Sequence, residues 1–129
     1  MSKVSKQVYV ELNNREDFHE ILKYNPGVIV IKLGATWCKP CQKIKALVNT
    51  LFLRTSDKVL CFDLDVDEMF DVYAYFKKNK LVNGVPVILV WKKGNTSVAA
   101  DYSVTGSDTV KINNLFKNKP TTKRYKFKN

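Results

Sequence analysis

The chain has 129 residues, 45% of them hydrophobic and 26% charged, which suits one globular domain with a real core. It contains no run of about 18 apolar residues and no apolar leader stretch, so we expect a cytoplasmic protein that does not cross a membrane. The net charge of +10 at pH 7 favours acidic partners, although a general excess of lysine explains it equally well.

The first half of the chain predicts three strands and two helices. Alternating residues in VYVEL suit a short strand, and Asn13 with Glu16 resembles a capping box before a helix. The almost continuous β-branched run VIVIKL suits a central strand covered on both faces. In chain order we expect a strand at 8–12, a helix ending at 25–27, a strand at 28–33, a helix starting near residue 39 and a buried strand at 58–66.

The second half predicts two helices and a hairpin. Asp67 is placed to cap a helix that continues to about Lys80. The segment VPVILVWKKGN is a strand that leads into a turn, and a strand at 97–104 returns as its antiparallel partner. Ser107 or Asp108 caps a last helix.

This order, β-α-β-α-β-α-β-β-α, predicts an α/β fold, with a central mixed sheet of about five strands, helices on both faces and a hairpin at one edge. We place the domain at residues 1–116. Residues 117–129 carry six positive charges and no acidic residue, which predicts a basic, flexible C-terminal tail. Tyr125 and Phe127 alternate there with basic residues, so the tail suits an acidic protein or nucleic acid, unless it is a solvated extension without a function.

Two cysteines lie in ATWCKPC, at the junction between a predicted strand and the next helix. Unpaired N–H groups and the helix dipole favour a thiolate at Cys38, and Lys39 adds a positive charge beside it. Such surroundings lower a cysteine pKa from about 8.5 into a range of about 3.5–7.5. Pro40 is tolerated early in a helix, and Cys41 lies one turn from Cys38. The pair predicts a two-step thiol–disulfide exchange in which Cys38 attacks and Cys41 resolves, without a bound cofactor.

Other interpretations of the cysteines stay open. Cys38, Cys41 and Cys61 could form a Cys₃His zinc site with His19, but one CxxC without a second paired spacing is a weak zinc signal. Cys61 is otherwise expected to be a buried thiol. A thiol pair that only packs, without turnover, is a second alternative. Triad hydrolysis is disfavoured because the chain has only one histidine.

ATWCKPC followed by a helix, with GVPVILVWKKGN further along, resembles the thioredoxin family over nearly the whole predicted domain. The resemblance implies that Cys38 is the exposed nucleophile and Cys41 the buried resolving thiol. It implies that Trp37 packs beside the motif and shapes the substrate surface, and that Pro86 is a cis-proline facing the disulfide. The backbone of Val85 is then expected to pair with an extended client segment.

Two sites depart from the family's pattern. Lys39 stands where the family usually has glycine, and a cation that stabilises the Cys38 thiolate makes the pair more oxidising. Lys32 stands where the family keeps a buried aspartate, and Asp63 where it often has a lysine or another polar residue. We hypothesise a charge-swapped pair beneath Cys41, in which Asp63 or a neutral Lys32 handles the proton of that thiol. The alternative has Lys32 extending to solvent beside a solvated Asp63.

The residues and the resemblance together predict a dithiol–disulfide oxidoreductase that acts as a reductant. Its expected partners are disulfide-containing client proteins and a thioredoxin-reductase-like or other electron donor, and its expected state is a monomer without a bound metal. A redox-silent module that docks through a basic surface, and a disulfide oxidase or isomerase, are the alternatives that the residues leave open.

Overall fold

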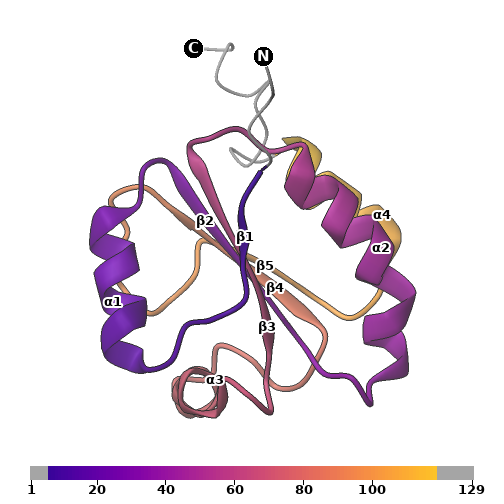
Figure 1. Ribbon diagram of the computed structural model, residues 1–129, viewed down its shortest axis with the longest axis horizontal. Coiled ribbons are helices and arrows are strands. Elements are labelled where there is room, and N and C mark those ends of the chain that lie inside the picture. The colour runs from indigo at the N-terminus through magenta and orange to yellow at the C-terminus, as the bar shows by residue number, and fades with distance from the viewer. Residues whose placement is uncertain (1–5, 119–129) are drawn as a thin grey trace.

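Residues 6–118 are described by the computed structural model in Figure 1. Five strands form one sheet in the order β1-β3-β2-β4-β5. β1, β3 and β2 are parallel, whereas β4 is antiparallel to both β2 and β5. The predicted mixed sheet with a hairpin at one edge is confirmed. The strands are β1 (Val8–Tyr9), β2 (Val28–Gly34), β3 (Val59–Asp65), β4 (Val87–Lys92) and β5 (Tyr102–Thr105).

Four helices cover the two faces of this sheet. α1 and α3 lie on one face, and α2 and α4 lie on the other (Figure 1). Within the described residues, no helix combines the length and the hydrophobicity that a membrane span requires. The helices are α1 (Arg15–Tyr24), α2 (Lys39–Leu53), α3 (Phe70–Lys78) and α4 (Thr109–Asn118).

Strand β2 is central in the sheet, and all of its residues are buried. Successive side chains of a strand point to opposite faces. Ile29 and Ile31 accordingly pack in the core beneath α1 and α3. Val28 and Val30 pack in the core beneath α2 and α4. Lys32 shares the parity of Val28 and Val30, so its side chain enters the face that α2 covers.

Aromatic rings fix the helices to both faces. Phe18 of α1 contacts Phe76 of α3 and Trp91 of β4, with ring centroids 4.9 and 5.2 Å apart, and all three side chains are fully buried. On the other face, the centroids of Phe52 and Phe116 lie 5.8 Å apart. Burying each such ring stabilises the fold by about 1.5–3 kcal/mol, so these contacts hold α1, α3, α2 and α4 against the sheet.

Helix α1 begins one residue later than the sequence pattern predicts. Asn14, not Asn13, is its N-cap, because Asn14 Oδ1 accepts a hydrogen bond from the N–H of Asp17 at 2.8 Å. Glu16 and Asp17 place negative charge in the first turn, where the helix dipole favours it. Strand β1 is also shorter than predicted and ends at Tyr9.

Helix α3 covers Phe70–Lys78, so the prediction that Asp67 caps it and that it reaches Lys80 is wrong at both ends. The preceding turn explains the late start. There the Asp65 carboxylate accepts hydrogen bonds from the N–H groups of Asp67 and Glu68, at 2.8 and 3.3 Å. At the other end, Lys80 has a left-handed backbone with φ of 60°, which is incompatible with helix continuation.

Strand β5 covers Tyr102–Thr105, so the strand predicted at 97–104 is wrong in its start. Side chains hold the preceding loop instead. Asp101 Oδ2 accepts a hydrogen bond from the N–H of Lys92 at 2.7 Å and another from the side-chain amide of Asn95 at 3.0 Å. These bonds replace the ladder that a longer strand would form with β4.

Helix α4 is capped by Asp108, one of the two predicted residues. Its carboxylate accepts hydrogen bonds from the N–H groups of Val110 and Lys111, at 3.0 and 3.2 Å. The helix runs to Asn118, past the domain boundary predicted at residue 116. The remainder of the predicted basic tail lies outside the described residues.

Arg15 and Asp71 join the first turns of α1 and α3. The Asp71 carboxylate accepts hydrogen bonds from the guanidinium and the backbone N–H of Arg15, both at 3.0 Å. The guanidinium bond is the main cause that lowers the pKa of Asp71 below its ordinary value. The native state therefore favours the charged form. Its contribution to stability is complete above about pH 4 and is lost as the pH falls through the lowered pKa.

Asp71→Asn should flatten this acid limb of the pH–stability curve. We expect the free energy of unfolding of the variant to lie below that of the wild type above about pH 4, and the gap to close at lower pH. Urea denaturation at a series of pH values measures this difference in the free energy of unfolding. Asp57→Asn is the matched control, since exposed Asp57 forms no ion pair with any described residue. A gap of constant size at every pH would contradict the prediction.

Candidate active site

Cys38 and Cys41 form a disulfide at the start of α2, with their Cα atoms 5.2 Å apart. β2 ends at Gly34, and residues 35–37 turn the chain into the helix. Cys38 is the N-cap residue, and its Sγ accepts a hydrogen bond from the N–H of Cys41 at 3.2 Å. Pro40 occupies the first turn, where its missing N–H would have had no partner. The helix N-terminus therefore favours negative charge on Cys38 when the disulfide is reduced.

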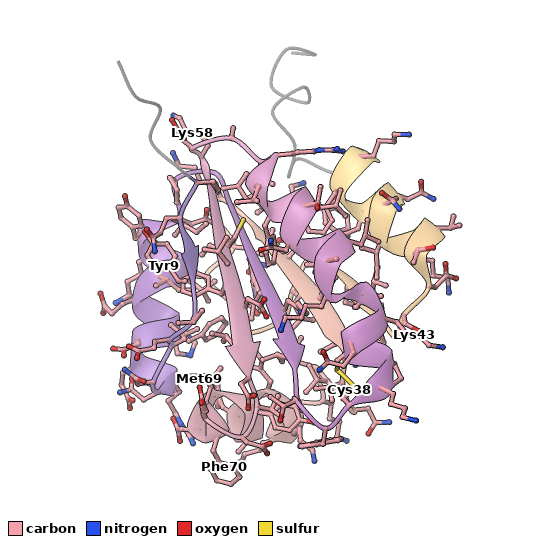
Figure 2. All side chains as sticks on the ribbon, turned by 45° about the vertical axis from the view of Figure 1, so that its right-hand side comes forward. Tyr9, Cys38, Lys43, Lys58, Met69 and Phe70 are labelled. Atoms are coloured by element: carbon pink, nitrogen blue, oxygen red, sulfur yellow. A yellow bond between two sulfur atoms is a disulfide. The ribbon has the colours of Figure 1, made fainter. Side chains whose placement is uncertain are left out.

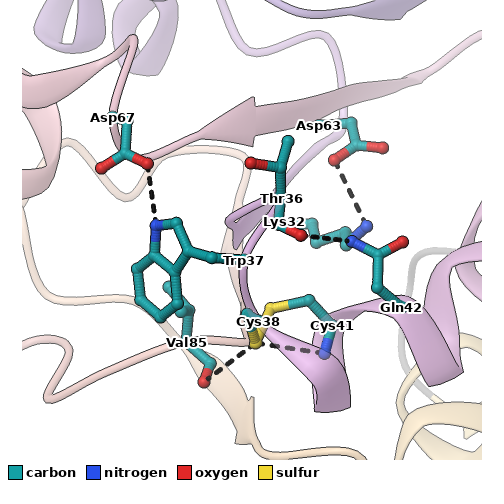
Figure 3. The surroundings of a disulfide bond; sticks show 9 residues. All are labelled: Lys32, Thr36, Trp37, Cys38, Cys41, Gln42, Asp63, Asp67 and Val85. Atoms are coloured by element: carbon teal, nitrogen blue, oxygen red, sulfur yellow. Dashed lines mark hydrogen bonds and ion pairs between the residues drawn. A yellow bond between two sulfur atoms is a disulfide. The ribbon is translucent and has the colours of Figure 1, made fainter.

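The two sulfurs differ in their neighbours rather than in their exposure. Cys38 is 5% exposed and Cys41 is 4% exposed, so the implied contrast between an exposed and a buried thiol is absent from the disulfide form. The reason is that Cys38 Sγ turns inward to Cys41 and lies 3.8 Å from the carbonyl oxygen of Val85. Cys41 instead faces Gly34, where an added Cβ would lie 3.5 Å from its Sγ. Figure 3 shows both sulfurs and their surroundings.

A second loop meets the disulfide. The Val85–Pro86 peptide bond is cis, and β4 begins at the next residue. Pro86 is buried, and its carbonyl oxygen accepts a hydrogen bond from the N–H of Gly106 at 2.9 Å, which ties the loop to the end of β5. Val85 points its carbonyl oxygen toward Cys38 (Figure 3). The loop thus places main-chain polar groups beside the reactive sulfur.

Trp37 lies on the surface beside Cys38 and is 67% exposed. Its Nε1–H donates a hydrogen bond to Asp67 Oδ2 at 2.9 Å (Figure 3). Asp67 belongs to the turn between β3 and α3, so this bond joins two loops that border the disulfide. The sequence pattern did not pair these residues, because no periodicity relates positions 30 residues apart on different loops.

Lys32 and Asp63 are register partners on the parallel strands β2 and β3. Asp63 has the parity of Val59 and Cys61, which pack beneath α2, so both charged side chains lie on that face. Lys32 Nζ lies 3.4 Å from Asp63 Oδ1, and the side chains are 6% and 35% exposed, respectively. Lys32 is therefore buried against a carboxylate and does not extend to solvent.

A cleft of about 230 Å³ opens to solvent beside this pair. Lys32, Asp63 and Cys41 all line it. Lys32 Cε and Cys41 Sγ lie within 3.8 Å of the same point, the position that a Cβ would take at Gly34. Water in the cleft therefore has access to the side of the disulfide where Cys41 lies. Sequence reasoning missed this cleft, whose other lining residues are Val10, Gly34, Ala35, Thr36, Gln42, Lys45, Leu64, Asp65 and Glu68.

The residues of the alternative zinc site lie apart. His19 is on α1, where its Nε2 lies 2.7 Å from the hydroxyl oxygen of Tyr75. Cys61 packs on the opposite face of the sheet, with its Sγ 3.5 Å from Thr55 Oγ1. Across residues 6–118, no three histidine, cysteine or acidic side chains are placed to hold one metal ion. The Cys₃His interpretation is therefore wrong.

Cys61 should resist thiol reagents until the protein unfolds. Burial is the main cause that raises the pKa of this fully buried thiol, so it stays protonated where a free cysteine begins to ionise. In reduced protein at pH 8, we expect iodoacetamide to label Cys38 quickly and Cys61 only after urea unfolds the chain. Peptide mass spectrometry reads out each site. Rapid labelling of Cys61 in the native protein would contradict the assignment.

The site as a whole defines a thiol–disulfide oxidoreductase. Two cysteines at a helix N-terminus can exchange two electrons through their own disulfide, and the adjoining loop places the Val85 carbonyl oxygen beside Cys38. A family model for thioredoxin matches residues 9–118. The chain therefore belongs to the thioredoxin family.

Comparison with individual proteins agrees with this family. The chain is 28% identical over 100 residues to Thioredoxin-1 of Drosophila melanogaster, covering 77% of this chain and 86% of that protein. It is 33% identical over 83 residues to Thioredoxin AMT13 of Alternaria alternata, covering 64% of this chain and 66% of that protein. The crystal structure of Plasmodium falciparum thioredoxin aligns with a TM-score of 0.69 at 26% identity, covering 91% of this chain and 92% of that one. The five-stranded sheet with four helices is the thioredoxin fold.

Proposed function

We propose that this protein reduces disulfides in client proteins by cycling Cys38 and Cys41 between thiols and a disulfide. The observation that carries the proposal is the disulfide at the N-cap of α2, with the Val85 carbonyl oxygen 3.8 Å from Cys38 Sγ. The names of the relatives support the direction of electron flow, since each is a thioredoxin. A cytoplasmic location fits a chain whose third cysteine, Cys61, is a free buried thiol.

The reductive cycle has two exchange steps. The Cys38 thiolate attacks one sulfur of the client disulfide, and the other client sulfur leaves as a thiolate. The Cys41 thiolate then attacks Cys38 Sγ, which forms the Cys38–Cys41 disulfide and releases the second client sulfur. The client gains two electrons, and an external donor, such as a thioredoxin-reductase-like enzyme, returns them to the cysteines.

The residues around the disulfide take supporting roles in this cycle. Val85 offers main-chain groups to an extended client segment, and Pro86 holds that loop in place beside Cys38. Trp37, fixed by its hydrogen bond to Asp67, supplies an apolar surface for the client. Such contacts bind the main chain and apolar side chains of a client, which most proteins share, so they allow many clients to be recognised.

The dipeptide between the cysteines adjusts the first step. Lys39 and the helix N-terminus stabilise the Cys38 thiolate, which speeds attack but also makes the disulfide more oxidising. Pro40 fixes the start of α2 and with it the orientation of Cys38. The reduction potential therefore decides between the reductant and its nearest alternative, an oxidase or isomerase.

The buried Lys32–Asp63 pair acts on the second step. The Lys32 ammonium stabilises the Cys41 thiolate across the cleft, while Asp63 neutralises Lys32 and accepts the Cys41 proton through cleft water. The support for this assignment is that Lys32, Asp63 and Cys41 line one cleft that solvent reaches.

Equilibration with glutathione tests the proposed direction. We expect a potential between about −270 mV, the thioredoxin value, and about −200 mV for the Cys38–Cys41 pair, because Lys39 raises it. A value above about −200 mV would indicate an oxidase or isomerase instead. Cys38→Ser is the control, because it cannot form the disulfide. If the wild type forms no reversible disulfide, the protein is a redox-silent binding module and the proposal fails.

A further inference from the structure

Two lysines lie next to the disulfide on the exposed face of α2. Lys39 is the first residue of α2, and Lys43 follows one turn later on the same face. Both are exposed, and neither forms an ion pair with any residue from 6 to 118. Figure 2 shows Lys43 pointing outward from α2 at the end of the helix where Cys38 lies. We call Lys39 and Lys43 the lysine side of the disulfide.

Helix stability does not explain these lysines. The first turn of α2 contains no acidic residue, whereas that of α1 contains Glu16 and Asp17 and that of α3 contains Asp71. Cations in the first turn of a helix are unfavourable, so Lys39 acts against the dipole of its own helix. Lys43, one turn further on, gains nothing from that dipole and forms no ion pair with any residue from 6 to 118. Charge that lowers local stability beside a reactive centre indicates a role in binding.

The other side of the disulfide is acidic. Asp65, Asp67 and Glu68 belong to the turn between β3 and α3, and we call them the acidic side. Asp67 is held by Trp37, and Asp65 by hydrogen bonds from the turn's own N–H groups. Figure 3 shows Trp37 and Asp67 on one side of Cys38 and the start of α2 on the other. Lys45 of α2 lines the same cleft as Asp65 and Glu68, so the acidic side has an excess of negative charge and not carboxylates alone. The surface that a client would cross therefore changes sign at the disulfide.

We propose that this polarised surface selects client segments with acidic residues on one flank of the reactive cysteine, the flank over Lys39 and Lys43. The opposite flank, over the acidic side, carries no acidic residue. An extended segment advances about 3.3 Å per residue, and one helical turn spans about 5.4 Å, so the lysines reach client residues about two to four positions from the cysteine. Complementary charges there raise the association rate. The inference rests on the proposed function, because it names the class of client.

Two peptides with the same composition and opposite polarity test it. One has the sequence Glu-Glu-Ala-Cys-Ala-Lys-Lys, the other Lys-Lys-Ala-Cys-Ala-Glu-Glu, and each is presented as a mixed disulfide with the same small thiol. Because their net charges are equal, the net charge of +10 of the protein attracts both alike. Their rates are divided by their rates with dithiothreitol, which removes differences in intrinsic reactivity. A third peptide with alanine at all flanking positions reports the proposed function itself.

We expect one polarity to be reduced about fivefold faster than the other at low ionic strength, and added salt to diminish the preference. Lys43→Glu should abolish or reverse it. Lys58→Glu, the same charge change at the opposite end of the molecule from Cys38 (Figure 2), should retain it. Circular dichroism checks that both variants are folded.

Four outcomes would overturn the inference. Equal rates for the two polarities, with the alanine peptide reduced, would remove the inference and leave the proposed function intact. A preference that survives Lys43→Glu would place its origin elsewhere. Equal rates combined with strong inhibition by single-stranded polyuridylate would assign the lysine side to nucleic acid. If the alanine peptide is not reduced either, the proposed function falls as well.

Discussion

Serine at Cys41 should arrest the protein as a covalent complex with its client, whereas serine at Cys38 should lower disulfide reduction by at least about a thousandfold, the scale on which loss of a nucleophile acts. The asymmetry follows from the site. Cys38 lies beside the Val85 carbonyl oxygen, where we propose that a client segment binds, whereas Cys41 faces Gly34 and the cleft. In the proposed cycle, Cys38 therefore attacks the client sulfur and Cys41 attacks Cys38.

Non-reducing electrophoresis and mass spectrometry of the trapped species measure the first result, and turnover of a peptide disulfide measures the second. Cys61→Ser is the matched control, because it removes a buried thiol that lies outside the active site. It should neither accumulate a mixed disulfide nor slow turnover. Efficient turnover by Cys38→Ser, or a stable adduct on Cys41, would reverse the assigned roles.

The strand and helix order was predictable because long-range packing and local pattern agree here. The β-branched run at 28–33 is predicted as a buried central strand and is one, since β3 and β4 pair with its two edges and helices cover both of its faces. The errors occur where polar side chains bind the backbone. Asn14, Asp65 and Asp101 each accept main-chain N–H bonds that move an element's start. Several residues of similar type compete for such bonds, so the sequence alone does not choose among them.

The spacing of the two cysteines was predictable from the sequence, whereas the contacts of the loops around them were not. The separation of Cys38 and Cys41 and the parity of strand residues are local properties, so they follow from the sequence. The hydrogen bond from Trp37 to Asp67 joins separate loops. The near-equal burial of the two cysteines depends on how the closed disulfide turns its sulfurs. These features exist only after the loops are assembled.

The lysines near the two cysteines are expected to shift the reduction potential in the same direction. In the proposed mechanism, Lys39 beside Cys38 and Lys32 near Cys41 each stabilise a thiolate more than a disulfide, so each is expected to raise the reduction potential. The two differ in setting. Lys39 is exposed and screened by solvent, whereas Lys32 is buried against Asp63. The buried cation should therefore have the larger effect, since Asp63 is one-third exposed and solvent screens its charge.

Replacing either member of the buried pair should move the Cys41 thiol pKa, in opposite directions. Lys32→Met removes a cation near the sulfur and should raise the pKa of Cys41, which slows the second exchange step at neutral pH by about tenfold. Asp63→Asn leaves the ammonium without its counter-charge and should lower that pKa. The titration is read from the ¹³Cβ shift of Cys41 in a Cys38→Ser background, so that one reactive thiol titrates alone.

The same variants measure how much the pair stabilises the fold. Removing one partner of a fully buried ion pair costs about 3–5 kcal/mol. Asp63 is one-third exposed, so Asp63→Asn should destabilise the fold by less, about 1–3 kcal/mol. Lys32→Met should cost less than Asp63→Asn, because an apolar side chain suits the site beneath α2 that Val28 and Val30 share. The double variant should recover most of the loss, which urea denaturation would show as a coupling between the two sites.

Lys58→Met is the control for both measurements, since it removes a lysine at the far end of the molecule from Cys38 (Figure 2). The pair has its proposed role only if the two single variants shift the Cys41 titration in opposite senses while this control leaves it unchanged. If stability changes but the Cys41 titration does not, Lys32 and Asp63 serve the fold alone. The proton of Cys41 is then removed by water in the cleft, without help from the pair.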